Sequence, residues 1–295
     1  MPPLTIPIVR AFVDNNQGGN PAGVVLNADQ YDQTTKQRIA TGVGLSETAF
    51  VSSSSVADFK LEFFTPVRQI AQCGHATVAT FLYLAQQDLL PSNHPSMETV
   101  DGVRGIYLEN EQAFMEQRAP TFVSPESVAD NLTTTRILAS LGLSAKDLFE
   151  GHHPLVVNTG NSFLLVPLRS ARAVEQLQPD LAAIETISEQ LGLIGYYVFS
   201  PQVQQAGRDA GARMFAPFYG IPEEPATGMA AGPLACYLYT YSQQKKSIFY
   251  IEQGHLMQPS SPSVLTARLT LDQETITSLW VGGRAAVSHL VKIDH

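Results

Sequence analysis

Short apolar runs of strand length make up much of the first half of the chain. They are rich in Val, Ile and Phe and are bounded by Gly, Pro, Asn or Ser, which is the pattern of β-strands. We expect strands over residues 6–13, 23–26, 48–52 and 59–64. Residues 32–41 have helical spacing, and Asp32 is placed to be the N-cap of that helix.

The segment that begins at Gly74 has a different pattern, because it is apolar on nearly every side. Its apolar residues are Ala76, Val78, Ala79, Phe81, Leu82 and Leu84. A helix without a polar face is buried inside a domain. We therefore predict a helix that the strands of the first half surround.

The second half of the chain repeats this order of elements. We expect strands over residues 155–157, 163–167, 196–200 and 212–215, a helix over 181–191, and a second apolar helix over 228–241. Short strands around one buried helix, present twice, favour a mixed α+β fold rather than a series of βαβ units.

Matching segments indicate that one half is a duplicate of the other. In chain order, they pair Gly19-Asn20-Pro21 with Gly160-Asn161-Ser162, Gly44-Leu45 with Gly192-Leu193, Phe64-Thr65-Pro66 with Phe215-Ala216-Pro217, and Gly74-His75-Ala76 with Gly228-Met229-Ala230. We expect one half to be residues 1–120 together with about 280–295, the last strand (about Ala285–Lys292) returning to it, and the other to be residues 121–279. The boundary is expected near Pro120–Pro125, with the active-site cleft between the halves.

Composition removes several classes of function. The 295 residues contain 18 Lys and Arg against 27 Asp and Glu, a net charge of −9. An acidic chain without a basic run argues against nucleic-acid binding. The beginning of the chain lacks the pattern of a signal peptide, and no apolar run reaches the roughly 18 residues that span a membrane. With only two cysteines, Cys73 and Cys236, we expect a cytoplasmic protein without a disulfide framework.

Both apolar helices begin with a glycine and a small residue, in Cys73-Gly74-His75-Ala76 and Thr227-Gly228-Met229-Ala230. The start of a helix presents N–H groups and the positive end of the helix dipole, which together attract anions such as a carboxylate. A glycine lets a ligand approach the backbone closely. The alternative is that these glycines serve only tight packing of the helix.

Three ionisable residues lie near these helix starts. His75 is in the first turn, where the helix dipole disfavours its cation and leaves a neutral imidazole able to transfer a proton. Glu47 stands at the start of a strand, and Glu224 lies four residues before Gly228. A structural histidine, an exposed strand end and a solvated acidic loop are the alternatives. The repeat equivalent of Glu47 is Gly195, so only one half carries this acid.

Other catalytic templates are incomplete. The glycines at 42 and 44 lack the third glycine of a dinucleotide-binding loop. The adjacent His152 and His153 have no cysteine or carboxylate at zinc-site spacing. Cys73 is adjacent to a helix start, which lowers a thiol pKa, but a lone thiol is more often a small buried residue. We expect neither a metal nor a cofactor.

Taken in order, four motifs resemble the phenazine-biosynthesis isomerase family (PhzF-like), within the diaminopimelate-epimerase fold superfamily. They are Gly19-Asn20-Pro21-Ala22-Gly23, Leu45-Ser46-Glu47-Thr48-Ala49-Phe50, the segment from Phe64-Thr65-Pro66 to Cys73-Gly74-His75-Ala76-Thr77, and Glu223-Glu224-Pro225-Ala226-Thr227-Gly228. The resemblance covers essentially the whole chain. It implies two pseudo-symmetric halves, each a rolled, mostly antiparallel sheet around a central helix.

The resemblance also implies a cofactor-independent isomerase that forms a homodimer. Glu47 matches the general acid/base of the family, with His75 and Glu224 as assisting catalytic residues. Asn20, Cys73, Gly74, Gly228 and Met229 are the expected substrate-binding residues. The expected substrate is a small metabolite that bears a carboxylate.

Three residues depart from the family pattern: Glu224 replaces Asp, Met229 replaces Ser or Asn, and Gln69 replaces Glu. These departures argue against the phenazine precursor as substrate, but they do not change the expected class of reaction. One alternative is an amino-acid epimerase or racemase with a thiol at each helix start. Cys73 fits the first position, but Cys236 lies about two turns beyond the second. The other alternative, which Met229 favours, is a non-catalytic binding homologue.

Overall fold

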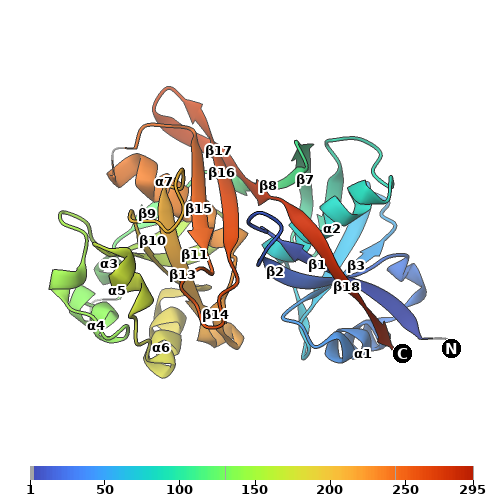
Figure 1. Cartoon of the computed structure of the whole chain (residues 1–295), viewed down its shortest axis with the longest axis horizontal. Helices are drawn as coiled ribbons and strands as arrows, with labels where there is room; N and C mark the ends of the chain where they lie inside the picture. Colours follow the sequence, from blue (N-terminus) through green and yellow to red (C-terminus); the bar gives the residue numbers. More distant parts are fainter. Residues whose placement is uncertain (1–2, 130, 243, 295) are drawn as a thin grey trace. The chain divides into compact units, whose positions relative to one another are not determined.

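The structure is a computed structural model that describes residues 3–129, 131–242 and 244–294. The chain divides into two compact units, Met1–Glu116 with Gly282–His295 (unit 1) and Gln117–Val281 (unit 2) (Figure 1). The first crossing between units falls inside strand β8 (Gln112–Arg118), before the expected Pro120–Pro125. Strand β8 continues through the division, and Pro125 instead occupies the first position of helix α3 (Pro125–Val128), where its missing N–H costs nothing.

Unit 1 is a mostly antiparallel sheet in the order β18–β1–β2–β3–β4–β6–β7–β8, with β5 also paired to β4. Two neighbouring pairs, β2–β3 and β4–β6, are parallel. The strands are β1 (Leu4–Ala11), β2 (Asn20–Val25), β3 (Thr48–Ser52), β4 (Phe59–Phe64), β5 (Gln69–Ile70), β6 (Ser96–Thr99), β7 (Gly102–Glu109), β8 and β18 (Ala285–Ile293). The return of the last strand beside β1 agrees with the expectation.

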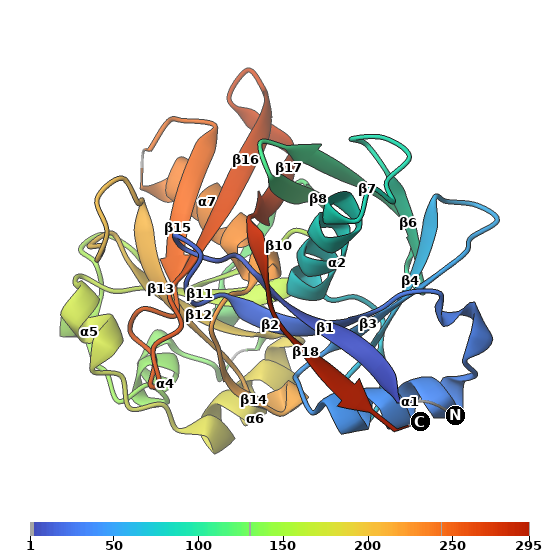
Figure 2. The ribbon, with the colours of Figure 1, turned by 45° about the vertical axis from the view of Figure 1, so that its right-hand side comes forward.

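Helix α2 (Gly74–Gln86) lies inside the curve of the unit 1 strands (Figure 2). It packs against β1, β2, β3 and β18, and every residue from Gly74 to Leu82 is buried. Burial on all sides agrees with a sequence whose apolar residues occur on nearly every side of the helix. The predicted buried helix is confirmed.

Helix α1 (Gln33–Val43) contacts β3, β4 and β18 of unit 1. The Asp32 side chain accepts a hydrogen bond from the Thr35 backbone N–H at 2.8 Å, which confirms the predicted N-cap. The helix ends at Gly44, whose φ of 69° places it in the left-handed region that glycine adopts at little cost.

Unit 2 repeats this architecture. Its sheet has the order β9–β10–β11–β12–β13–β15–β16, with β14 also paired to β13. The strands are β9 (Thr121–Val123), β10 (Leu155–Asn158), β11 (Ser162–Pro167), β12 (Gly195–Ser200), β13 (Ala210–Ala216), β14 (Ile221–Glu224), β15 (Ile248–Gln253), β16 (Ser263–Asp272) and β17 (Thr275–Gly283), of which the last runs into unit 1. The parallel pairs are β11–β12 and β13–β15, the counterparts of those in unit 1.

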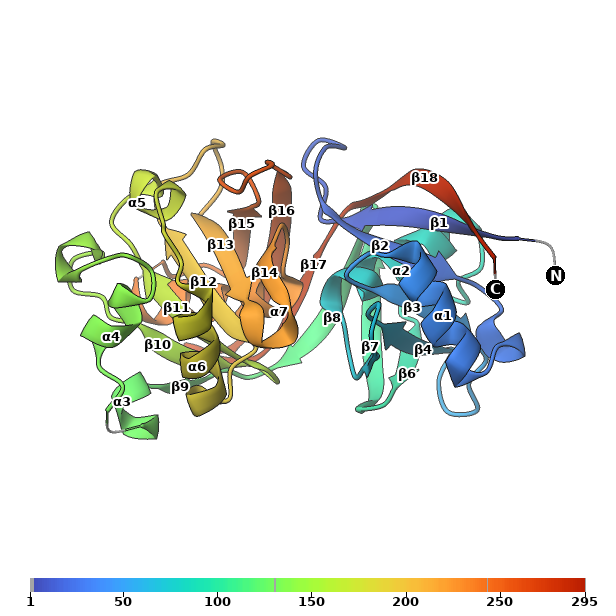
Figure 3. The same cartoon turned by 90° about the horizontal axis from the view of Figure 1, so that it is seen from below.

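The central helix of unit 2 is α7 (Gly228–Tyr241), which packs against β10, β11 and β16. Helix α6 (Leu181–Leu191) contacts β12 and β13 and corresponds to α1. Seen from below, α1 and α6 each lie over the strands of their own unit (Figure 3). The remaining helices are α3, α4 (Thr134–Ala139) and α5 (Ala171–Glu175), with short 3-10 turns at Ala28–Gln30, Ala145–Asp147 and Pro217–Tyr219.

The strand registers confirm the predicted pseudo-symmetry residue by residue. In unit 1, Thr48 pairs with Gly23 on one side and Phe64 on the other. In unit 2, Tyr196 pairs with Leu164 and Phe215, the predicted equivalents of Gly23 and Phe64. The expected α+β fold class is therefore confirmed.

Several strands were not predicted, above all β6, β7 and β8 in unit 1 and β15, β16 and β17 towards the end of the chain. Strand β7 shows why, since most of its residues are exposed or half-buried. It lacks the alternation of polar and apolar residues that marks a strand facing a core. Its conformation comes from pairing with β6 and β8. Among the described residues, no helix is long and apolar enough to cross a membrane.

Candidate active site

Three polar residues meet in unit 1 because the topology brings together the ends of three elements. Asn20 begins β2, Glu47 immediately precedes β3, and His75 is in the first turn of α2. Strands β2 and β3 are parallel, so their amino-terminal ends lie at one edge of the sheet. The Gly23 N–H donates to the Glu47 carbonyl at 3.2 Å, and α2 packs directly against β2 and β3.

Glu47 and His75 form a buried pair. Nε2 of His75 is 3.3 Å from Oε2 of Glu47, and the two residues are only 3% and 4% exposed, respectively. Nδ2 of Asn20 is 3.0 Å from Nδ1 of His75. With the amide nitrogen of Asn20 as the donor, Nδ1 is the acceptor, so the ring proton resides on Nε2, the nitrogen that lies 3.3 Å from the Glu47 carboxylate.

Cys73 lies against the same imidazole. Its Sγ is 3.4 Å from Nδ1 and 3.9 Å from Nε2 of His75. Thr77 holds this residue in place, because its N–H and hydroxyl both donate to the Cys73 carbonyl, at 3.0 and 2.7 Å. The structure thus places the predicted residues Asn20, Glu47, Cys73 and His75 together, with Gly74 between the last two in sequence.

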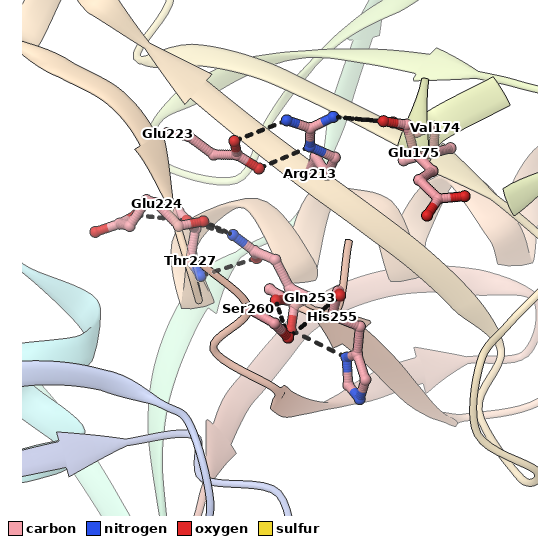
Figure 4. Close-up of polar contacts among 10 residues, drawn as sticks. Val174, Glu175, Arg213, Glu223, Glu224, Thr227, Gln253, His255 and Ser260 are labelled. Atoms are coloured by element: carbon pink, nitrogen blue, oxygen red, sulfur yellow. Dashed lines mark hydrogen bonds and ion pairs between the residues drawn. The ribbon is translucent and has the colours of Figure 1, made fainter. Parts of the chain in front are cut away.

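The remaining predicted residues lie in unit 2, around the start of α7. Glu224 ends β14 and accepts a hydrogen bond from the Thr227 hydroxyl. Gln253, at the end of β15, donates to the Glu224 carbonyl at 2.6 Å and to the Thr227 hydroxyl at 3.2 Å (Figure 4). It also accepts from the Thr227 N–H at 3.0 Å. This side chain therefore fixes the turn that carries Glu224.

Gln253 is a site residue that the sequence analysis missed. It is 1% exposed and receives a further hydrogen bond from the Tyr197 hydroxyl at 2.9 Å. Burial raises the pKa of Tyr197 far above its usual value, so the hydroxyl stays a donor. The available signal was weak, because Gln253 is one of two polar residues, with Glu252, at the end of β15 and is separated from Thr227 in sequence by α7.

Two further polar side chains hold the first turn of α7. Gln117 donates to the Gly228 carbonyl at 3.0 Å, and the Thr159 hydroxyl donates to Gln117 at 2.8 Å. A Cβ on Gly232 would lie 2.2 Å from Oε1 of Gln117, so a larger residue there would displace the Gln117 side chain. Met229 is half-buried in the first turn. Because Glu224, Gly228 and Met229 belong to unit 2, a single cleft shared with unit 1 stays a prediction.

The two units share a scaffold but not its ionisable residues. The position of Glu47 corresponds to Gly195, where a Cβ would lie 2.3 Å from the Phe215 carbonyl oxygen. Any larger side chain there would displace the backbone. In turn, the register of β14 on β13 makes Glu224 the counterpart of Ile70 on β5. Each unit therefore contributes one acid that the other lacks.

The second cysteine is unsuited to act as a base. Cys236 is completely buried within α7, and burial raises the pKa of its thiol to about 12. A proton-abstracting thiol must be ionised near neutral pH. The alternative of epimerisation by one thiol from each unit therefore lacks its second group.

Comparison with known proteins gives a consistent result. The sequence profile of the phenazine biosynthesis-like proteins matches residues 9–289. The uncharacterized isomerase YddE of Escherichia coli O157:H7 is 34% identical over 234 residues, 78% of this chain and 77% of that protein. The trans-2,3-dihydro-3-hydroxyanthranilate isomerase of Pseudomonas chlororaphis is 30% identical over 287 residues, 94% of each chain. The crystal structure of a PhzF-family phenazine biosynthesis protein from Bacillus anthracis superposes with a TM-score of 0.90, covering 100% of both chains at 27% identity.

Proposed function

Because the chain belongs to the phenazine biosynthesis-like family and is an isomerase of that family, we propose that it moves a proton between two carbon atoms of a small carboxylate-bearing metabolite. The observation that carries this proposal is the buried contact of 3.3 Å between Nε2 of His75 and the Glu47 carboxylate. A carboxylate that is held by an imidazole and shielded from water suits general acid–base chemistry.

Glu47 acts as the principal acid and base in this proposal. Its ionised carboxylate accepts a proton from one carbon of the substrate. The carboxylic acid so formed exchanges its proton with solvent and then protonates another carbon. The Nε2–H group of His75, 3.3 Å from the carboxylate, stabilises its ionised form electrostatically between these steps. Asn20 assists by keeping the ring proton on Nε2, since its amide donates to Nδ1.

The substrate carboxylate is recognised at the start of α2. The first backbone N–H groups of a helix have no partner within the helix and attract anions, and those of Gly74 and His75 adjoin the acid–base pair in sequence. Glu224 of unit 2 assists the proton transfer from the turn that Thr227 and Gln253 hold.

The substrate differs from trans-2,3-dihydro-3-hydroxyanthranilate in the group that meets the start of α7. Met229 has no side-chain N–H or O–H, so this turn favours an apolar substituent where Ser or Asn would bind a polar one. Trans-2,3-dihydro-3-hydroxyanthranilate remains the first compound to test, because the Pseudomonas relative is named as its isomerase.

Proton NMR in heavy water tests the acid–base role. The protein is incubated with trans-2,3-dihydro-3-hydroxyanthranilate, analogues lacking its hydroxyl, and diaminopimelate. With the wild type, we expect deuterium to enter a carbon of trans-2,3-dihydro-3-hydroxyanthranilate or of one of its analogues. Glu47→Gln is expected to lower that rate by about 100-fold or more.

Glu116→Gln is the matched control, because it removes an exposed carboxylate from β8 in the same unit. It should exchange at the wild-type rate. Exchange that survives in Glu47→Gln contradicts the assigned role, and exchange at the α-carbon of diaminopimelate alone favours an epimerase.

A further inference from the structure

Glu47, Cys73 and His75 together have the composition of a transition-metal site. All three are buried, and one ligand atom of each lies within 4.8 Å of the others. The proposed proton transfer uses the carboxylate and the imidazole but has no use for the thiol. We propose that this cluster binds Zn²⁺ and that bound Zn²⁺ blocks the acid–base pair.

The distances between the ligand atoms are close to those of a tetrahedral zinc site. With ordinary Zn–N, Zn–O and Zn–S bond lengths, neighbouring ligand atoms lie about 3.4–3.6 Å apart. Nε2 of His75 is 3.3 Å from Oε2 of Glu47 and 3.9 Å from Sγ of Cys73. Sγ of Cys73 lies nearer to Nδ1, at 3.4 Å, so its side chain must turn toward Nε2 and the Glu47 carboxylate for the three ligand atoms, which lie within 4.8 Å of one another, to share one ion. Three protein ligands leave a fourth position for water or a substrate atom.

The charges of the cluster also match a divalent ion. A carboxylate and a thiolate supply two negative charges, and the neutral imidazole supplies none, so the complex with Zn²⁺ has no net charge. Such a complex avoids the cost of an uncompensated charge in a buried site.

Asn20 provides the outer hydrogen bond that zinc-binding histidines require. A metal on Nε2 requires the ring proton on Nδ1, and a ligating histidine almost always donates that proton to a neighbouring oxygen. The Asn20 amide lies 3.0 Å from Nδ1. Rotating the amide by half a turn presents its oxygen to Nδ1 in place of its nitrogen. The same residue thus supports one tautomer for proton transfer and the other for the metal.

Metal binding and proton transfer exclude one another, because both need Nε2 of His75 and the Glu47 carboxylate. This inhibitory consequence rests on the proposed function, whereas binding itself does not. The thiolate selects a thiophilic ion, so Zn²⁺ should bind and Mg²⁺, which prefers oxygen ligands, should not.

Zn²⁺ titration of the reduced, metal-stripped full-length protein in competition with a chromophoric chelator tests the site without any substrate. We expect one Zn²⁺ per chain. Cys73→Ser should lower the affinity by more than about 100-fold, and Asn20→Ala by about 10- to 100-fold. Cys236→Ala and His152→Gln are the matched controls and should bind like the wild type. Mg²⁺ should not displace Zn²⁺ from the protein.

Co²⁺ gives a readout on the wild-type protein that does not depend on whether a variant folds. It should produce the intense visible bands of tetrahedral cobalt and a thiolate-to-cobalt charge-transfer band. Circular dichroism of Cys73→Ser shows whether its loss of binding is local. Binding unaffected by Cys73→Ser, binding lost in His152→Gln, or no binding by the wild type overturns the proposal.

Activity measurements then separate the two proposals. Zn²⁺ should abolish deuterium exchange, and a chelator should restore it. Zn²⁺ binding without any turnover contradicts only the proposed isomerisation. Turnover that saturating Zn²⁺ leaves unchanged contradicts the blocking role.

Discussion

At the scale of single residues, the direction of one hydrogen bond determines what the imidazole of His75 offers to a substrate. The ring lies between Asn20 on Nδ1 and Glu47 on Nε2, at 3.0 and 3.3 Å. A histidine with both nitrogens engaged has a defined tautomer, and the tautomer determines which nitrogen is a donor. Asn20 is therefore a positioning residue, although it does not exchange a proton itself.

Replacing Asn20 with Ala should lower kcat by about tenfold or more, because the Nε2–H of His75 is then no longer enforced. KM should change little. A positioning role predicts in addition that the acidic limb of the kcat profile against pH shifts, whereas a purely structural role predicts lower thermal stability with the profile in place. Asn20→Asp, which retains a hydrogen-bonding side chain, should show the shift without the loss of folding.

Two adjacent glutamates of β14 provide a matched pair of variants. Glu224 belongs to the turn before α7, whereas Glu223 accepts two hydrogen bonds from Arg213, at 2.7 and 2.8 Å (Figure 4). Neighbouring strand residues point to opposite faces, so the two carboxylates serve different purposes. Glu224→Gln should reduce kcat, and Glu223→Gln should retain it while losing about 1–3 kcal/mol of stability. Steady-state kinetics and urea unfolding of both variants check this, and equal kinetic effects would contradict it.

At the scale of elements, a buried ion pair joins α1 to β4. Lys36 on the helix contacts Glu62 on the strand, and both side chains are buried. Burial raises the pKa of Glu62, but hydrogen bonds from Lys36 and Gln33 outweigh it, so the pKa of this carboxyl lies below the usual 4.5. A lowered pKa means that the pair stabilises the fold above about pH 4.5 and that this stability is lost as the pH falls below that value.

Glu62→Gln should cost about 3–5 kcal/mol at neutral pH, because it leaves the Lys36 charge buried without its partner. Urea unfolding at a series of pH values measures the difference from the wild type, which should shrink below pH 4.5. The double variant Lys36→Met/Glu62→Leu should recover most of the stability. A cost that stays constant across this pH range would indicate that the carboxylate charge is not responsible.

At the scale of the whole molecule, one unit is a continuous piece of chain and the other is not. Unit 2 is the uninterrupted stretch Gln117–Val281 and has its own core of Leu, Ile, Val and aromatic residues. Unit 1 needs both ends of the chain, since β18 pairs with β1 along its length and Val291 and Ile293 pack on its core. The two units should therefore respond differently to truncation.

Residues 117–281 expressed alone should fold and unfold cooperatively, as expected of a unit with its own core. Residues 1–116 alone should not fold, because β1 then loses β18 and the apolar residues that it brings. Joining Glu116 to Gly282 by a short glycine linker should restore folding, since Gly282 lies directly against the Ala113 backbone. Circular dichroism and urea unfolding of the three fragments test this, and a folded 1–116 fragment would contradict it.

Local signals made part of the molecule predictable from the sequence. The Asp32 cap and the mostly apolar sequence of α2 predict these elements correctly because the causes lie within a few residues. The contact between Asn20 and His75 depends instead on parallel pairing of β2 and β3 and on packing of α2, across 55 residues of sequence. The role of Gln253 could not be predicted for the same reason, since its hydrogen bonds to Glu224 and Thr227 form only when the folded sheet places β15 beside the turn before α7.

Pairing of the first and last strands means that a circular permutation would make both repeats continuous in sequence. Leu4 lies opposite Ile293 in the antiparallel β1–β18 pair, so a short turn can join the two ends. By position in the sheet, β18 corresponds to β9, the first strand of unit 2. A circularly permuted chain that starts at Gln117 would therefore run through unit 2 and then through unit 1, each beginning with the equivalent strand. In this permuted order the sequence is a simple tandem repeat. Unit 1 is discontinuous in the natural chain only because the termini lie between β18 and β1 rather than between the two units.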